Sequence, residues 1–133
     1  MDERVEAVAR ACQAGAEDGT MTFPAILGAL AEAGFEGYAI DFRRATAIYY
    51  LSDGDSVELA GHRVGTPIAP ALDAARMREA IGEAQRLVPG YTYRGFCEKA
   101  AAAGCAGYLV SLSGRRALYY GRTAETHVEA FPT

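Results

Sequence analysis

The sequence predicts an α+β fold in which an antiparallel sheet packs against a layer of helices. Three observations lead to this prediction. The chain has 133 residues, which suits one small domain. Its second half repeats the residue pattern of the first half at an offset of 70 positions. Within each half, apolar residues change from helical spacing to strict alternation, which indicates helices followed by strands.

The repeat is clearest between residues 22–51 and residues 92–121. Aligned positions are mainly glycine, alanine and aromatic residues: Ala33-Gly34 with Ala103-Gly104, Gly37-Tyr38 with Gly107-Tyr108, and 47–50 with 117–120. We therefore expect a tandem duplication of a helix-helix-β-hairpin unit. Its copies span about 1–60 and 71–133 and are joined by a Gly/Pro-containing connector, 61–70. Because such units are small, we expect one domain over 1–133, with a shared core and pseudo-twofold symmetry.

In the first half, apolar residues at helical spacing predict a helix that ends before Thr20. Thr22 is typical of an N-cap and Gly34 of a helix end, so a second, shorter helix lies between them. From Tyr38 the period becomes two, which places Tyr38, Ile40 and Phe42 on the core face. Further strands are expected over 46–51 and 56–59.

The second half follows the same plan. Asp73 caps a helix that we expect to end at Pro89-Gly90, and a second helix leads to Gly104. Strands are expected over 108–112, 116–120 and 126–130. Equivalent glycines, Gly34 and Gly104, are expected at helix ends with positive φ, since each follows an apolar helical stripe.

Composition excludes several classes of protein. A net charge of −4 argues against general nucleic-acid binding. No apolar run reaches the roughly 20 residues that cross a bilayer, and the acidic start lacks the basic region of a secretory signal, so we expect a cytoplasmic protein without a membrane partner. Three cysteines without a CxxC pair indicate neither a disulfide framework nor a zinc site. No metal and no cofactor are predicted.

The last expected strand carries the first group of candidate site residues. Alternation places Glu125, His127 and Glu129 on one face, with Val128 and Ala130 turned to the core. A histidine between two carboxylates could be an acid/base pair, a ligand-binding group or part of a metal site. The alternative is a solvated outer face of an edge strand, where charged side chains suppress aggregation.

A second group of candidates surrounds the last hairpin. Its arginines could bind an anionic ligand beside tyrosine rings; the residues are Arg115, Arg116, Arg122, Tyr119 and Tyr120. The alternative is that these arginines cap the turn or pair with the nearby glutamates. Tyr49 and Tyr50 alternate in the same way as Tyr119 and Tyr120, so one ring of each pair faces the helices. If the outer pair meets across the symmetry axis, it lines a groove suited to a ligand.

The C-terminal motif resembles a known family. The pattern runs Ala-Gly-Cys-x-Gly-Tyr from Ala103, Gly-Arg-Arg from Gly114, and Tyr-Tyr-Gly-Arg-Thr-x-Glu-x-His-Val-Glu-x-Phe-Pro from Tyr119. It resembles the YdfO-like family of small, often prophage-encoded proteins, commonly labelled phage envelope protein. The resemblance implies an α+β fold, but no established activity or catalytic residue.

Three functions therefore remain open. The first is a non-enzymatic module that binds a small anionic ligand or a protein partner, with a homodimer as a candidate state, because no nucleophile-base-orienter set is evident. The second is a small enzyme in which His127 is the general base, with Glu125 or Glu129 and with Arg115 or Arg122. The third is a phage-associated structural or accessory role.

Overall fold

The computed structural model describes residues 1–132. The first half comprises α1 (Glu3–Asp18), α2 (Phe23–Ala33), β1 (Phe35–Asp41), β2 (Thr46–Leu51) and β3 (Ser56–Ala60). The second half comprises α3 (Ala74–Arg86), α4 (Tyr93–Ala102), β4 (Cys105–Ser111), β5 (Arg116–Gly121) and β6 (Thr126–Ala130). The strands form one antiparallel sheet in the order β3-β2-β1-β4-β5-β6. The predicted α+β class is confirmed, and the helix-helix-strand order recurs in both halves; the duplication itself stays a prediction.

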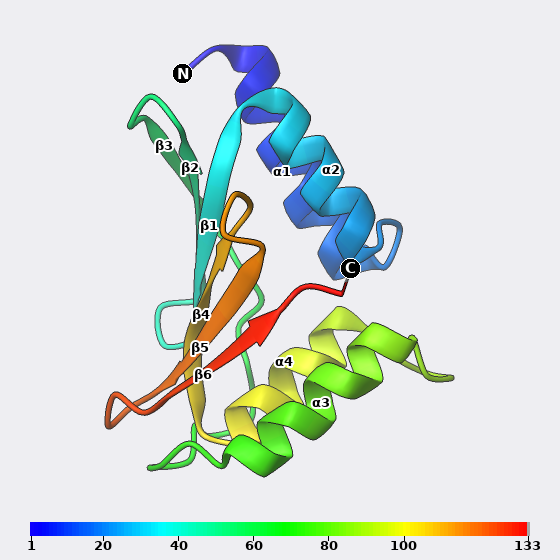
Figure 1. The fold of residues 1–133 in the computed structure, drawn as a ribbon, viewed down its shortest axis with the longest axis vertical. Coiled ribbons are helices and arrows are strands. Elements are labelled where there is room, and N and C mark those ends of the chain that lie inside the picture. Colours follow the sequence, from blue (N-terminus) through cyan, green and yellow to red (C-terminus); the bar gives the residue numbers. More distant parts are fainter. Residues whose placement is uncertain (133) are drawn as a thin grey trace.

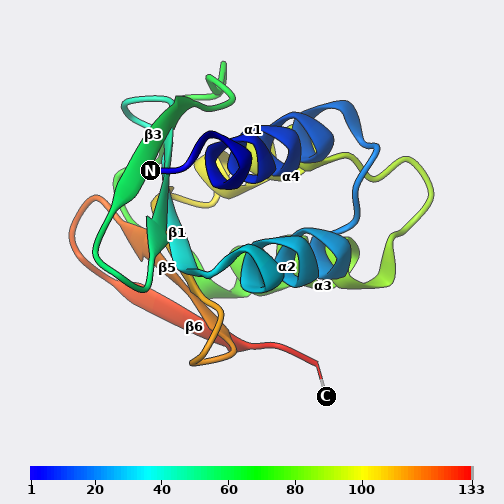
Figure 2. The same cartoon turned by 90° about the horizontal axis from the view of Figure 1, so that it is seen from above.

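All four helices cover one face of the sheet. Figure 1 shows α1 and α2 over one end of this face and α3 and α4 over the other. The view from above in Figure 2 shows no helix of residues 1–132 over the opposite face. The sheet therefore has an inner face, packed against helices, and an open face. None of the helices in the described part of the chain combines the length and the apolar character needed to cross a membrane.

Local sequence explains where the helices begin and end. The side chains of Asp2, Thr22, Asp73 and Thr92 each accept a hydrogen bond from a backbone N–H in the first turn of a helix. Gly34 and Gly104 follow α2 and α4 with φ of 98° and 90°, as expected. α3 was expected to continue to Pro89-Gly90, but it ends at Arg86, because Leu87 takes the left-handed conformation and caps the last turn.

The two halves meet where β1 pairs with β4. This pairing runs from Gly37 opposite Ser111 to Asp41 opposite Gly107. A Cβ atom on Gly37 would collide with the carbonyl oxygen of Val110, and one on Gly107 with the carbonyl oxygen of Ile40. The central strands can approach this closely only because both positions lack a side chain.

A row of buried tyrosines crosses this junction on the inner face. Tyr49 stacks on Tyr38 with ring centroids 5.2 Å apart, and Tyr108 lies 5.2 Å from Tyr119. Tyr38 and Tyr108 join the two pairs at 6.4 Å. Tyr49 donates a hydrogen bond to Gln13 Oε1 at 2.6 Å, and the hydroxyls of Tyr93 and Tyr108 are 2.7 Å apart. Burial raises the pKa of each of the four ring hydroxyls.

The segment between β3 and α3 is fastened to α4 by one carboxylate. Glu98 accepts hydrogen bonds from the backbone N–H groups of Gly65 and Thr66 and from the Thr66 hydroxyl, and its Oε2 lies 2.8 Å from His62 Nε2. Hydrogen bonding to His62, followed by that to Thr66 and Gly65, lowers the pKa of Glu98. Glu98 and His62 thus position the connector.

The glycines at the β1–β4 junction yield a stability prediction. Gly37→Ala and Gly107→Ala should each lower the free energy of unfolding by about 1–3 kcal/mol, because the added methyl group must displace backbone. Gly28→Ala is the control, since Gly28 lies within α2 with open space around its Cβ position. That change should raise stability by about 0.5–1 kcal/mol. Urea unfolding of the three variants measures this, and unchanged stability of Gly37→Ala and Gly107→Ala would contradict the packing described.

The connector yields a pH prediction. Because the pKa of Glu98 is lower in the folded state, its contribution to stability is present above its ordinary pKa and is lost as pH falls through the folded value. Glu98→Gln should therefore reduce the fall in melting temperature on acidification below about pH 4.5. Glu32→Gln, at an exposed position of α2, should leave this acid dependence unchanged. Equal acid profiles for wild type and Glu98→Gln would contradict the assignment.

Candidate functional site

His127 and Glu129 point toward the helices, contrary to the prediction for this strand. His127 pairs with Tyr119 in β5, which belongs to the core, and directly opposed residues share a face of the sheet. Val128 and Ala130, which were expected in the core, are exposed instead. The prediction was wrong because the register of β6 is set by Tyr119, whereas the apolar pattern of β6 alone suggests the opposite orientation.

The two side chains form a partly buried pair. His127 Nε2 lies 3.4 Å from Glu129 Oε2, and the side chains are 14% and 31% exposed. The Nε2 atom is buried and has no hydrogen-bond partner within residues 1–132. The imidazole lies 6.5 Å from the Tyr119 ring. This arrangement can provide a base and a carboxylate on the inner side of the sheet edge.

The strand at the opposite edge of the sheet, β3, has the reverse arrangement of polar and apolar side chains. On β3 the inward positions are Val57 and Leu59, and the outward position between them is Glu58. On β6 the inward positions are His127 and Glu129, and the outward one is Val128. α1 packs against β3, whereas no comparable packing of α3 against β6 occurs among the described residues. β6 therefore has polar side chains on its inner face and an apolar side chain on its outer face, the reverse of β3.

Glu125 does not join this pair. It lies in the β5–β6 turn, where its carboxylate accepts hydrogen bonds from the Thr123 hydroxyl and from the backbone N–H of Leu72. These bonds lower the pKa of Glu125. The carboxylate therefore holds the turn against the segment just before α3 and is not available to orient His127.

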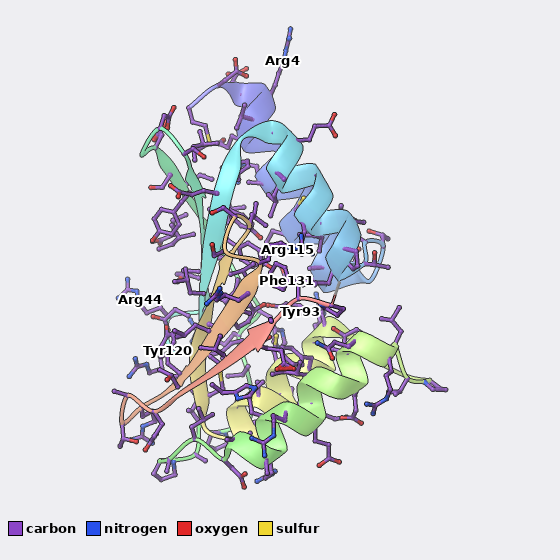
Figure 3. All side chains as sticks on the ribbon, viewed as in Figure 1. Arg4, Arg44, Tyr93, Arg115, Tyr120 and Phe131 are labelled. Carbon is purple, nitrogen blue, oxygen red and sulfur yellow. The ribbon has the colours of Figure 1, made fainter. Side chains whose placement is uncertain are left out.

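The three candidate arginines are not brought together. Arg115 lies over the ring of Phe131, 5.9 Å from its centroid, on the inner side of the sheet (Figure 3). Arg116 bonds back to the carbonyl oxygen of Gly114 in the hairpin turn. Arg122 donates to the carbonyl oxygen of Ile68 at the other end of β5, roughly 20 Å along the strand. No shared anion site results from them.

The predicted tyrosines divide between the two faces. Tyr49 and Tyr119 are buried in the inner row, and Tyr50 and Tyr120 lie on the open face. In Figure 3 Tyr120 points away from the helices. The outer pair does not meet, because the two residues lie about 14 Å apart across the sheet and about 14 Å apart along the strands, roughly 20 Å in all. The groove that was expected between them is therefore absent from the described part of the chain.

Thiol and metal chemistry find no support within residues 1–132. All three cysteines are buried, and burial raises the pKa of Cys97 to about 12 and of Cys105 to about 11. No three His, Cys, Asp or Glu side chains of this range are grouped to hold a metal ion. Two small pockets, of about 150 and 270 Å³, lie beside α3 and α4 and contain none of the predicted site residues.

The open face carries a feature that the sequence interpretation missed. Apolar side chains from five neighbouring strands lie directly opposite one another in a single cross-strand row. From β2 to β6 these are Ile48, Ala39, Leu109, Leu118 and Val128. Leu109 and Val128 are 45% and 48% exposed. We call this set the apolar row.

The apolar row is flanked by two exposed or half-exposed tyrosines. Tyr50 lies opposite Gly37 on one side of the row, and Tyr120 lies opposite Gly107 on the other. Asp41 raises the pKa of Tyr120 further, after the larger effect of burial. The flanking rings extend the apolar surface on both sides of the row.

The sequence did contain a signal for this face. In Tyr108-Leu109-Val110 and Ala117-Leu118-Tyr119 the residues are apolar at successive positions, so both faces of each strand are apolar. Such strands are typical of a sheet covered on both faces. Only one face of this sheet is covered by helices.

Comparison with protein families gives a match over most of the chain. Residues 21–129 match the family described as Protein of unknown function (DUF1398). The chain belongs to this family. A comparison with curated proteins finds no match. The family description assigns no activity, and the resemblance to YdfO-like proteins stays a prediction.

The inward polar pair of β6 yields a prediction. Replacing His127 and Glu129 together by Val and Leu, the residues at the matching positions of β3, should raise the free energy of unfolding by about 1–3 kcal/mol. The reverse exchange, Val57→His with Leu59→Glu, should lower it. Urea unfolding measures both. If replacing His127 and Glu129 lowers the free energy of unfolding instead, the pair stabilises the fold, and the prediction is contradicted.

Proposed function

We propose that this chain is a non-enzymatic interaction module that binds a protein through the open face of its sheet. The observation that carries the proposal is the apolar row, which presents side chains of five strands to solvent. Contiguous exposed apolar surface is typical of sites that another macromolecule covers.

Binding of a small anionic ligand has less support. The candidate arginines are engaged at separate places, with Arg122 on the connector and Arg115 over Phe131. Pockets of about 150 and 270 Å³ fall below the roughly 300–1,000 Å³ of ordinary ligand sites. A protein partner is therefore better supported than a small anionic ligand.

A second candidate function rests on the buried, unpartnered Nε2 of His127 beside Glu129. This pair could act as a general base and its orienting group. A thermal-shift screen of small metabolites on wild type and His127→Ala tests it. A compound that stabilises only the wild type would support the small-enzyme or ligand-binding role.

The cysteine content of the chain allows a direct test of the main proposal. Because the native cysteines are buried, a cysteine introduced at Ser111, two residues along β4 from Leu109 on the same face, should be the accessible thiol of the open face. We expect Ser111→Cys, which leaves the apolar row intact, to be protected from a membrane-permeant maleimide in the host cell but to react readily in dilute purified protein. Leu87→Cys, at a leucine 57% exposed after α3, should react in both settings.

Equal labelling of Ser111→Cys and Leu87→Cys in the host cell would contradict a covered open face. The experiment shows whether the open face is covered in the cell, whichever protein covers it. The phage-associated role and the cytoplasmic location both stay proposals, and the same labelling in a phage-free host strain would separate a phage partner from a host one.

A further inference from the structure

The open face has matching projections and recesses at its centre. Leu109 and Ala39 lie directly opposite each other in the β1–β4 pair, beside the midline of the sheet. Leu109 is a large side chain that is 45% exposed. Ala39 is a small side chain beside it on the same face. A projection and a recess therefore adjoin on one surface.

We infer that the open face binds a second copy of this chain, face to face, about a twofold axis that runs parallel to the strands between β1 and β4. This inference rests on the proposed docking function of that face. This rotation places β1 over the partner's β4. Each cross-strand row then lies over the equivalent row of the partner. Each leucine at position 109 then lies over the alanine at position 39 of the other copy.

The next strands outward fit the same arrangement. Ile48 on β2 faces the leucine at position 118 of the other copy, since β2 lies over β5. Tyr50 on β2 lies in the row of Arg116 on β5, so its ring meets the guanidinium of the second copy, a favourable cation–π pair. A self-complementary patch of this kind is what a closed twofold dimer requires.

The angle between the strands of the two packed sheets determines which contacts of the dimer are well defined. Two sheets that pack face to face differ in strand direction by about 30° because of their twist. Positions near the centre of the face move least under this rotation. The leucine–alanine contact is therefore the best-defined element of the interface, and contacts at β3 and β6 are displaced.

The size of the face sets the expected affinity. Six strands at about 4.8 Å spacing and five residues of about 3.4 Å each give a face of roughly 24 by 17 Å. Its footprint of about 400 Å² per copy lies below the roughly 800 Å² per partner of standard interfaces. The dimer should therefore be weak and concentration-dependent, with a dissociation constant on the order of micromolar.

Sedimentation equilibrium of the full chain over a wide range of concentrations tests the inference. Wild type should pass from monomer to dimer, and Leu109→Lys should stay monomeric at every concentration. Leu87→Lys, the change at an exposed leucine away from the sheet, should dimerise like wild type. Circular dichroism shows that each variant is folded.

A size exchange tests the orientation of the two copies. Leu109→Ala and Ala39→Leu should each weaken dimerisation about tenfold or more, the first by emptying the contact and the second by overfilling it. The double variant, which exchanges the two residues, should recover dimerisation because the projection and the recess only change places. If the exchange fails to recover dimerisation while both singles weaken it, this orientation is wrong.

A wild type that stays monomeric at every concentration would overturn the inference. If Ser111→Cys is nevertheless protected in the host cell, the docking function survives and the partner is a different protein. If Ser111→Cys is freely labelled in the host cell and the purified chain is monomeric, both proposals fail. The two experiments therefore separate the failure of the partner assignment from the failure of the docking face.

Discussion

The pairing of β1 with β4 is the interaction on which the rest of the structure depends. Each half contributes three strands, and only this pairing joins them into one sheet. The close approach of the two strands requires glycine at positions 37 and 107. On the inner face it brings Tyr38 to Tyr108, so the aromatic rows of both halves become continuous. On the open face it brings Ala39 to Leu109, at the centre of the apolar row.

Placement of all helices on one side of the sheet has a consequence for each face. The inner face is filled by aliphatic side chains, phenylalanine, cysteine and the tyrosine row, and two hydroxyls of that row are hydrogen-bonded to Gln13 and Tyr93. The open face keeps apolar side chains in solvent, and burying them against another surface would be favourable. β6 is the exception on both faces, because it turns His127 and Glu129 inward and Val128 outward. Polar residues that face inward on an edge strand also limit unwanted strand pairing.

Much of the fold could be predicted from the sequence, since it depends on local signals. The caps at Thr22 and Asp73, the glycines at 34 and 104, and the alternation through Tyr38, Ile40 and Phe42 all act within a few residues. These signals suffice to place helices, strands and the core face of β1. The strands over 46–51 and 126–130 were placed with the bounds that the structure shows.

The candidate site was predicted less well, because it depends on register between strands and on contacts distant in sequence. The orientation of His127 follows from its pairing with Tyr119, which the pattern of β6 alone does not reveal. The separation of Arg115 from Arg122 follows from the length of β5. The Glu98–His62 contact joins residues 36 positions apart. The apolar row exists only once five strands are aligned.

The apolar row is exposed in the single chain, and we propose that a second copy covers it. Solvent paramagnetic relaxation of methyl groups measures this most directly, with a soluble gadolinium chelate added at low and at high protein concentration. We expect strong relaxation of the Ile48, Leu109 and Leu118 methyls in dilute protein and protection of these methyls when the protein is concentrated. Leu87 should remain relaxed throughout and Leu30 protected throughout. Protection of the apolar row in dilute monomer, or equal relaxation of its methyl groups at both concentrations, would contradict this proposal.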